Sequence, residues 1–244
     1  MSTPSADVAP DVAPSGAGPS GRPARLLVMD VDSTLIAQEV IELLADHAGT
    51  REQVAAVTER AMRGEIDFTA SLRERVATLA GVPVEAFADV RARATFTAGA
   101  PELVAEARRR GWEVGLVSGG FEEVVAPLAA ELGITLYRAN RLEASDGRLT
   151  GRTVGPVVDR AAKATTLLEF AARLGVPRED TIAVGDGAND LDMIAAAGIG
   201  IAFAAKPLVR EQAPYTVDGP RLDAVLDVVD GADAARRQAG GRPT

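Results

Sequence analysis

Short runs of apolar residues alternate along most of this chain with segments that have helical periodicity. The predicted strands are Leu26–Met29, Glu113–Val117, Thr181–Val184, Ile199–Phe203 and Tyr215–Val217. Helices are predicted near residues 121–132, 160–174, 189–197 and 221–230. Strands that alternate with helices are joined by right-handed crossovers, which give a mainly parallel sheet covered on both faces. The sequence therefore predicts an α/β fold with a doubly wound, mainly parallel sheet. Around residues 146–147 it predicts a β-hairpin instead.

Residues 37–95 interrupt this alternation, because no part of them has the pattern of a strand. Apolar residues recur there at helical spacing, as in the series Phe68, Leu72, Val76 and Leu79. We expect residues 37–95 to form a small helical cap domain, inserted directly after the first strand and therefore placed over the residues that follow that strand. The α/β core would then consist of residues 25–36 and 96–244.

Residues 1–24 have a different composition from the rest. They are rich in Ala, Pro, Ser and Gly and contain no aromatic residue. Such a segment cannot bury enough apolar surface to offset the entropy that it would lose on ordering. We expect a disordered tail without a catalytic role.

The charge of the chain limits its partners. A net charge of −9 and a pI of about 4.8 argue against binding to nucleic acid, which needs a basic face. No stretch approaches the ~18 consecutive apolar residues of a membrane-spanning helix. The absence of cysteine excludes disulfides and thiolate zinc sites. We expect a cytoplasmic monomer or homodimer that acts on a small molecule and contacts no membrane.

Polar, glycine-rich segments follow three of the predicted strands. They are Asp30-Val31-Asp32, Ser118-Gly119-Gly120 and GDGAND at residues 185–190. Ligands of doubly wound sheets bind beyond the carboxyl ends of the strands. An isolated Asp-x-Asp pair is more typical of a turn or a helix cap. Converging carboxylates without a counter-charge would repel each other, however, and a hard dication such as Mg²⁺ relieves that repulsion. Its candidate ligands are Asp30, Asp32 and Asp186. Asp190 would support them.

Two basic residues are candidates for binding anions. Lys163 opens a predicted helix and could accompany a phosphate held by the Ser118–Gly120 segment, although a capping turn and a surface lysine are the plainer interpretations. Arg75 lies within the apolar stripe of its helix, and an inward guanidinium needs a partner such as a carboxylate. The alternative is an arginine that extends from the edge of the stripe into water. Periodicity alone places Glu39 on a solvated flank.

Together these motifs resemble a known family. DVDST at 30–34, SGG at 118–120, Lys163 and GDGAND at 185–190 have the order and spacing of the haloacid dehalogenase (HAD) superfamily of phosphotransferases. From about Leu26 to about Asp218 the chain is more closely similar to its phosphoserine phosphatase family, including the segments AMRGEIDF, SLRERV, VSGGF and GDGANDLDM. The resemblance implies a HAD-like core.

The resemblance also implies a mechanism. Asp30 would be the nucleophile and form an aspartyl-phosphate, and Asp32 would be the general acid and base. Mg²⁺ would be held by Asp30, by the backbone carbonyl of Asp32 and by Asp186. Ser118, the Gly119 amide, Lys163 and Asn189 would bind or adjoin the phosphoryl oxygens. Glu39 would bind the ammonium group of the substrate, and Arg75 its carboxylate.

The activity implied is that of a phosphoric monoester hydrolase, a phosphatase that converts O-phospho-L-serine to L-serine and phosphate in the last step of L-serine biosynthesis. One alternative keeps the chemistry but uses another small phosphomonoester, or transfers the phosphoryl group to an alcohol such as homoserine. Another is a phospho-receiver module in which phosphorylated Asp30 is a signal. Asp32 argues against that alternative, because a positioned acid and base would discharge the signal.

Overall fold

The structure is a computed structural model that describes residues 23–62 and 65–240. The sequence prediction of a tail over residues 1–24 therefore falls almost entirely outside the described residues. A seven-stranded sheet has the order β4-β3-β2-β1-β5-β6-β7. Its strands are β1 (Leu26–Met29), β2 (Glu113–Phe121), β3 (Leu136–Ser145), β4 (Arg148–Val154), β5 (Thr181–Gly185), β6 (Ile199–Phe203) and β7 (Tyr215–Val217). Neighbouring strands are parallel except β3 and β4, which form the predicted hairpin. The predicted α/β fold is confirmed.

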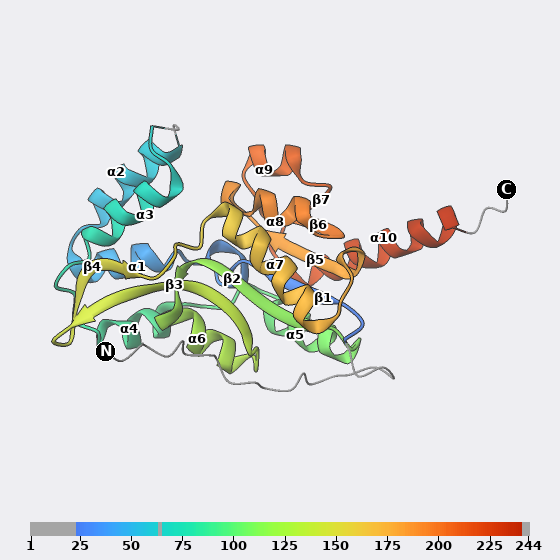
Figure 1. Cartoon of the computed structure of the whole chain (residues 1–244), viewed down its shortest axis with the longest axis horizontal. Helices are drawn as coiled ribbons and strands as arrows, with labels where there is room; N and C mark the ends of the chain where they lie inside the picture. Colours follow the sequence, from blue (N-terminus) through green and yellow to red (C-terminus); the bar gives the residue numbers. More distant parts are fainter. Residues whose placement is uncertain (1–22, 63–64, 241–244) are drawn as a thin grey trace, which may run out of the picture.

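Helices cover both faces of the sheet, which buries alternate residues of β1 in different layers. Leu27 and Met29 face a core formed with α5 (Ala100–Arg109), α6 (Glu122–Glu131) and α10 (Val225–Gly240). Leu26 and Val28 face the opposite core, formed with α7 (Arg160–Leu174) and α8 (Leu191–Ala196). Figure 1 shows these two layers of helices on either side of the strands. The short helix α9 (Pro207–Gln212) follows β6 and precedes β7 in the sequence.

Four helices lie between β1 and α5 in the sequence: α1 (Val40–Ala48), α2 (Arg51–Met62), α3 (Phe68–Ala77) and α4 (Ala86–Arg93). The pair α2 and α3 projects away from the sheet (Figure 1). The hairpin strand β4 supports its base, because Gly81 N donates to Leu149 O at 2.8 Å and Leu149 N donates to Val82 O at 2.8 Å. Gly151 of β4 has a φ of +82°, and a Cβ there would lie 3.1 Å from Ala80. Glycine thus allows β4 to approach this helical segment closely.

The second strand is longer than the sequence predicts. The glycines after Val117 suggested a loop, yet β2 continues to Phe121 with a shift in register between Val117 and Phe121. This irregular stretch contains the SGG segment, lies at the carboxyl end of β2 and leads into α6.

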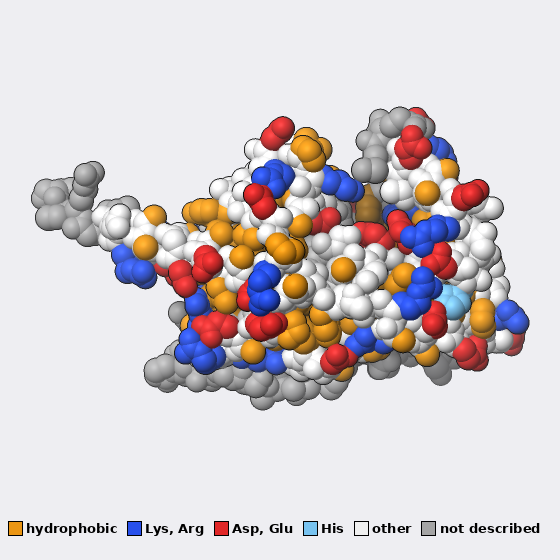
Figure 2. All heavy atoms as spheres, turned by 180° about the vertical axis from the view of Figure 1, so that it is seen from behind, with side chains coloured by type: hydrophobic (Ala, Val, Ile, Leu, Met, Phe, Trp, Pro, Cys, Tyr) orange, Lys and Arg blue, Asp and Glu red, His pale blue; other side chains and the backbone are white. Residues whose placement is uncertain are grey.

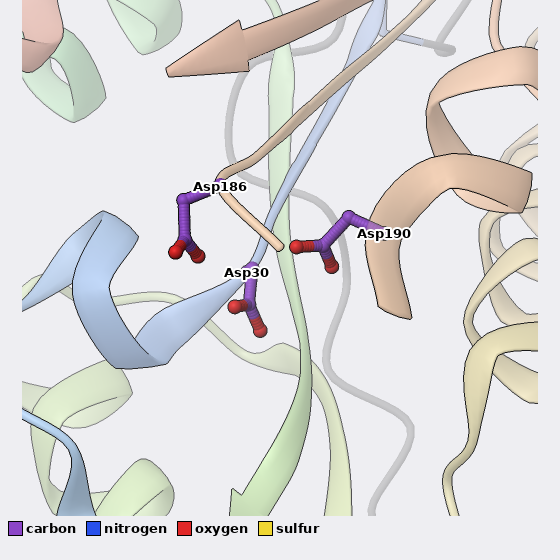
Figure 3. Close-up of side chains that lie close together, drawn as sticks. All are labelled: Asp30, Asp186 and Asp190. Carbon is purple, nitrogen blue, oxygen red and sulfur yellow. The ribbon is translucent and has the colours of Figure 1, made fainter. Parts of the chain in front are cut away.

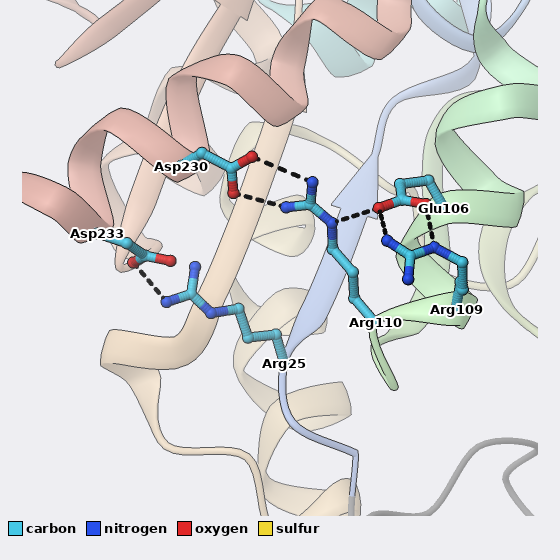
Figure 4. A network of polar contacts seen from close by, with 6 residues as sticks. All are labelled: Arg25, Glu106, Arg109, Arg110, Asp230 and Asp233. Atoms are coloured by element: carbon cyan, nitrogen blue, oxygen red, sulfur yellow. Dashed lines mark hydrogen bonds and ion pairs between the residues drawn. The ribbon is translucent and has the colours of Figure 1, made fainter.

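Ion pairs connect the last helix, α10, to Arg25 before β1 and to Arg110 after α5 (Figure 4). Asp233 of α10 pairs with Arg25 at 2.6 Å, and Asp230 pairs with Arg110 at 2.6 Å. Both arginines also lie over the ring of Trp112, at 5.7 and 5.4 Å from its centroid. Since Trp112 is the only tryptophan of the chain, its fluorescence reports on the integrity of this core. Among the described residues, no helix combines the length and apolar character needed to cross a membrane.

Candidate active site

The carboxyl ends of β1, β2 and β5 meet at a cavity of about 460 Å³. Figure 2 shows the surface hollowed between the part that carries α2 and α3 and the part that carries α9. Predicted site residues that line the cavity are Asp30, Asp32, Glu39, Arg75, Gly119, Asp186 and Asn189. The other two, Ser118 and Lys163, are fully buried. The structure therefore brings residues from five separate parts of the chain to one place.

Three carboxylates gather at the base of this cavity. Asp30 follows β1, Asp186 follows β5, and Asp190 stands at the start of α8 (Figure 3). Each offers an oxygen within 4.8 Å of the others. Burial raises the pKa of Asp30 well above its usual range, and Asp190 adds to the effect. Burial also raises the pKa of Asp186 to about 7, again with repulsion from Asp190. The cluster carries more negative charge than its surroundings stabilise.

Lys163 neutralises part of that charge from inside the protein. Its Nζ lies 2.6 Å from Asp30 Oδ1 and 2.6 Å from Asp190 Oδ1. Burial alone would lower the pKa of Lys163, but Asp190 and Asp30 outweigh it and raise the pKa. Asp159 caps the helix that carries this lysine, since its side chain accepts from Ala162 N at 2.9 Å. The plainer interpretation of Lys163 as a surface residue is wrong.

Asp32 has surroundings distinct from those of the cluster. It lies in the short turn η1 (Val31–Leu35), and its Oδ1 accepts a hydrogen bond from Val40 N at 3.1 Å. Ser33 has a φ of +56°, a strained value for a residue other than glycine, and donates to Glu39 at 2.6 Å. Burial, with repulsion from Glu39, raises the pKa of Asp32 to about 7. A carboxyl group that titrates near neutral pH can both donate and accept a proton.

The SGG segment approaches Asp32 closely. Ser118 Oγ accepts from Gly120 N at 2.8 Å, which fixes this part of the backbone. A Cβ on Gly120 would lie 2.5 Å from Asp32 Oδ2, and one on Gly119 would lie 3.0 Å from Phe68. A side chain at position 120 would therefore displace the Asp32 carboxylate, and one at position 119 would press against the Phe68 ring.

Arg75 and Glu39 lie on the helical side of the same cavity. Arg75 Nε donates to Ser71 O at 3.3 Å, and within the described residues its guanidinium forms no ion pair. Burial lowers the pKa of Arg75, while Glu39 and Asp32 oppose that effect. A largely buried arginine that lines a cavity without a bonded carboxylate is available to an anionic group of a ligand.

Comparison with known proteins identifies the family. The haloacid dehalogenase-like hydrolase family matches residues 27–195. The phosphoserine phosphatase of Streptococcus thermophilus is 56% identical over 205 residues, which are 84% of this chain and 95% of that protein. This chain belongs to the phosphoserine phosphatase family of HAD-like hydrolases.

Other members of the family support the assignment. The phosphoserine phosphatase of Streptomyces coelicolor is 50% identical over an alignment that covers all of this chain but 61% of that protein. This chain thus spans about three fifths of that relative's length. A solved structure, described as the phospho-aspartyl intermediate analogue of phosphoserine phosphatase, is 40% identical with a TM-score of 0.80. It covers 85% of this chain and 99% of its own. The predicted family and the HAD-like fold are confirmed.

HAD phosphatases use a metal ion, and the acidic cluster of this family member fits one. Its donors are oxygen atoms only, as hard cations prefer. Asp190 has both oxygens engaged, by Lys163 and by Gly187 N at 3.0 Å. Asp30 and Asp186 therefore offer the more accessible oxygens. The side chain of Asp32 is not part of the cluster. This agrees with the family resemblance, which implies that Asp32 would bind the metal only through its backbone carbonyl.

Two features at or beside the cavity were not predicted from the sequence. Thr34 donates to Asp186 Oδ1 at 3.3 Å and so connects the β1 and β5 loops. Lys206 lines the cavity beyond the carboxyl end of β6. The strand-end rule that identified the other three loops would also have identified Lys206, had it been applied to β6.

Proposed function

We propose that this chain hydrolyses O-phospho-L-serine to L-serine and phosphate through an aspartyl-phosphate on Asp30. The observation that carries the proposal is one cavity that combines phosphoryl-transfer carboxylates with an arginine lacking an ion pair among the described residues. The high identity to phosphoserine phosphatases supports the same substrate. We further propose that the reaction serves as the last step of L-serine biosynthesis in the cytoplasm, in a monomer or homodimer.

The first step would be attack on phosphorus. Lys163 holds Oδ1 of Asp30 at 2.6 Å, which leaves Oδ2 as the attacking oxygen. As the new oxygen–phosphorus bond forms, the bond between phosphorus and the serine oxygen breaks. The proton on Asp32, whose pKa of about 7 keeps it partly protonated, moves to that serine oxygen. L-serine then leaves.

The second step would be hydrolysis of the aspartyl-phosphate. The carboxylate of Asp32 takes a proton from water, whose oxygen attacks phosphorus and displaces Asp30. One group thus acts as acid and then as base, which a pKa near neutrality permits. The hydrogen bond from Val40 N keeps the carboxylate of Asp32 in place for both steps.

The metal is proposed to be Mg²⁺, held by Asp30, Asp186 and the backbone carbonyl of Asp32. When bound, it would neutralise the carboxylates and the phosphoryl oxygens that approach them. Ser118, the Gly119 amide and Lys163 would bind the phosphoryl oxygens, with Asn189 nearby.

Specificity is proposed to come from the helical segment 37–95, acting as a cap domain over the core of residues 25–36 and 96–244. Arg75 would bind the carboxylate of phosphoserine, and Glu39 its ammonium group. Charge-assisted bonds of this kind discriminate strongly when the site is desolvated, because a substrate without the matching group leaves a buried charge unpaired.

The test is phosphate release from phosphoserine, phosphoethanolamine, glycerol phosphate and p-nitrophenyl phosphate, with and without EDTA. We expect turnover that EDTA abolishes and Mg²⁺ restores, fastest with phosphoserine. Equal rates for all four esters would refute the substrate, and activity in EDTA would refute the metal. Loss of phosphoserine in the presence of homoserine without matching phosphate release would favour the phosphotransferase alternative.

A further inference from the structure

Lys206 lies at the cavity in a chain that almost never uses lysine. Of its 26 basic residues, 24 are arginines, and Lys163 and Lys206 are the only lysines. One is buried against the carboxylate cluster and the other lines the same cavity. Arginine forms planar, bidentate pairs with carboxylates, whereas the ammonium of lysine is a compact point charge on a flexible stem. Both lysines of the chain therefore lie at the acidic site.

Among the described residues that line the cavity, Lys206 is the basic side chain that is exposed and has no ion pair. The other basic residues that line the cavity are Arg75, which is largely buried, and Arg160, which pairs with Asp192 at 2.5 Å. Lys206 is exposed, and among the described residues its side chain forms no ion pair or hydrogen bond. Its side chain lines the same cavity as Asp186.

The backbone around Lys206 is fixed. Ala204 N donates to Val217 O at 2.8 Å, and the carbonyl of Lys206 accepts from Val209 N at 3.0 Å and Arg210 N at 3.1 Å. Ala204 has a φ of +44°, a strained value that such contacts sustain. The stem of Lys206 can move, while its attachment point stays at the rim.

The surrounding charge makes a rim cation useful. A phosphomonoester is a dianion, yet the protein carries a net charge of −9, and among the described residues five acids line the cavity: Asp30, Asp32, Glu39, Glu42 and Asp186. Long-range repulsion of this kind slows the approach of an anion, and a local cation at the mouth counteracts it.

We propose that Lys206 is a substrate-capture residue, which binds the phosphate dianion as it enters and leaves the cavity. It would affect binding of the phosphoryl group and its dependence on salt, while Asp30 and Asp32 perform the chemistry. The inference rests on the proposed phosphatase function, but it applies to any phosphomonoester.

Kinetics of Lys206→Gln test the proposal, with phosphoserine and p-nitrophenyl phosphate as separate substrates. At low ionic strength we expect KM for both, and the inhibition constant of inorganic phosphate, to rise roughly three- to fivefold, the effect of one exposed charge pair. The value of kcat should stay within twofold. The difference should disappear near ~0.5 M salt, where charges are screened over a few ångströms. Lys206→Arg, which keeps the charge, should restore KM.

The matched control is Arg210→Gln, which removes one positive charge from α9, the helix that Lys206 caps, at a position outside the cavity lining. It should leave KM and its salt dependence unchanged. If Lys206→Gln had the same KM as the parent, or an equal effect appeared in Arg210→Gln, the proposal would be refuted. A fall in kcat at constant KM would refute it as well, since that places Lys206 in the chemistry. Failure with phosphoserine but turnover of p-nitrophenyl phosphate would overturn only the proposed substrate.

A direct observation is possible because the chain has only two lysines. Labelling with ¹³C-lysine gives two Cε signals, which Lys206→Arg assigns. Inorganic phosphate added with Mg²⁺ should shift the Lys206 signal at the concentration that inhibits the enzyme. Inhibition without any change in that signal would contradict capture by Lys206.

Discussion

Replacing Lys163 with methionine tests how this site balances its charge. Lys163 is fully buried and 2.6 Å from both Asp30 and Asp190. Methionine retains most of the volume but leaves these carboxylates without their buried cation. Removal of one partner from a buried ion pair typically costs about 3–5 kcal/mol of unfolding free energy. For a chain of this size, about 1 kcal/mol corresponds to roughly 2–4 °C, so Tm should fall by about 6–20 °C.

The assay is thermal and urea unfolding at pH 8 in EDTA, followed by Trp112 fluorescence. Lys206→Met is the matched control, since it makes the same substitution at the exposed lysine and should change stability by no more than ~0.5 kcal/mol. The loss in Lys163→Met should be smaller at pH 5, because the carboxylates can take up protons instead of repelling each other. Excess Mg²⁺ should restore part of the stability that Lys163→Met loses. If Lys163→Met were as stable as Lys206→Met at pH 8, the argument from buried charge would fail.

Three further predictions follow from the same geometry. Gly120→Ala should lower kcat at least ~10-fold with little loss of Tm, because the added Cβ would lie 2.5 Å from Asp32 Oδ2 and displace that carboxylate. The control is Gly231→Ala, where an added Cβ meets nothing within 4 Å, and it should leave kcat unchanged. Asp32→Asn should reduce kcat by about 10²–10⁴ in phosphate-release assays, whereas turnover at the parental rate would disprove its acid–base role. The pKa values of Asp32 and Asp186 are raised from 3.8 to about 7, so the stability that they contribute is full below pH ~4 and is lost as pH rises through 7. In EDTA, Tm should therefore fall between pH 5 and 8. Added Mg²⁺ should raise Tm more at pH 8 than at pH 5. A rise in Tm that does not depend on pH would contradict the raised pKa values.

The core of the fold was predictable because each signal is local. Four-residue apolar runs such as Leu26–Met29 identify buried parallel strands, and the loops after them fall at one edge by topology alone. The spacing of Phe68, Leu72 and Arg75 places the arginine on an inward face by helical periodicity alone. The course of β2 was harder to predict, because Gly119 and Gly120 are typical of loops. Only their close approach to Phe68 and Asp32 explains why glycine continues an irregular strand there.

The remaining site features depend on tertiary contacts that periodicity does not encode. Glu39 has the pattern of a solvated helix flank, yet the strained turn at Ser33 donates to it and directs it to the cavity. Lys163 has no local sign of burial, since its position is decided by two aspartates 133 and 27 residues away. Resemblance to the family supplied both assignments, which the residues alone did not.

The most direct test of the account is the ratio of kcat/KM for phosphoserine to that for phosphoethanolamine, measured in the parent and in Arg75→Gln. Phosphoethanolamine lacks only the carboxylate that Arg75 is proposed to bind. We predict a ratio of about 100 in the parent, the value of one charge-assisted hydrogen bond in a desolvated site, and a ratio below ~5 in the variant. A parent ratio near one, or a ratio that Arg75→Gln leaves unchanged, would contradict the proposed recognition of phosphoserine.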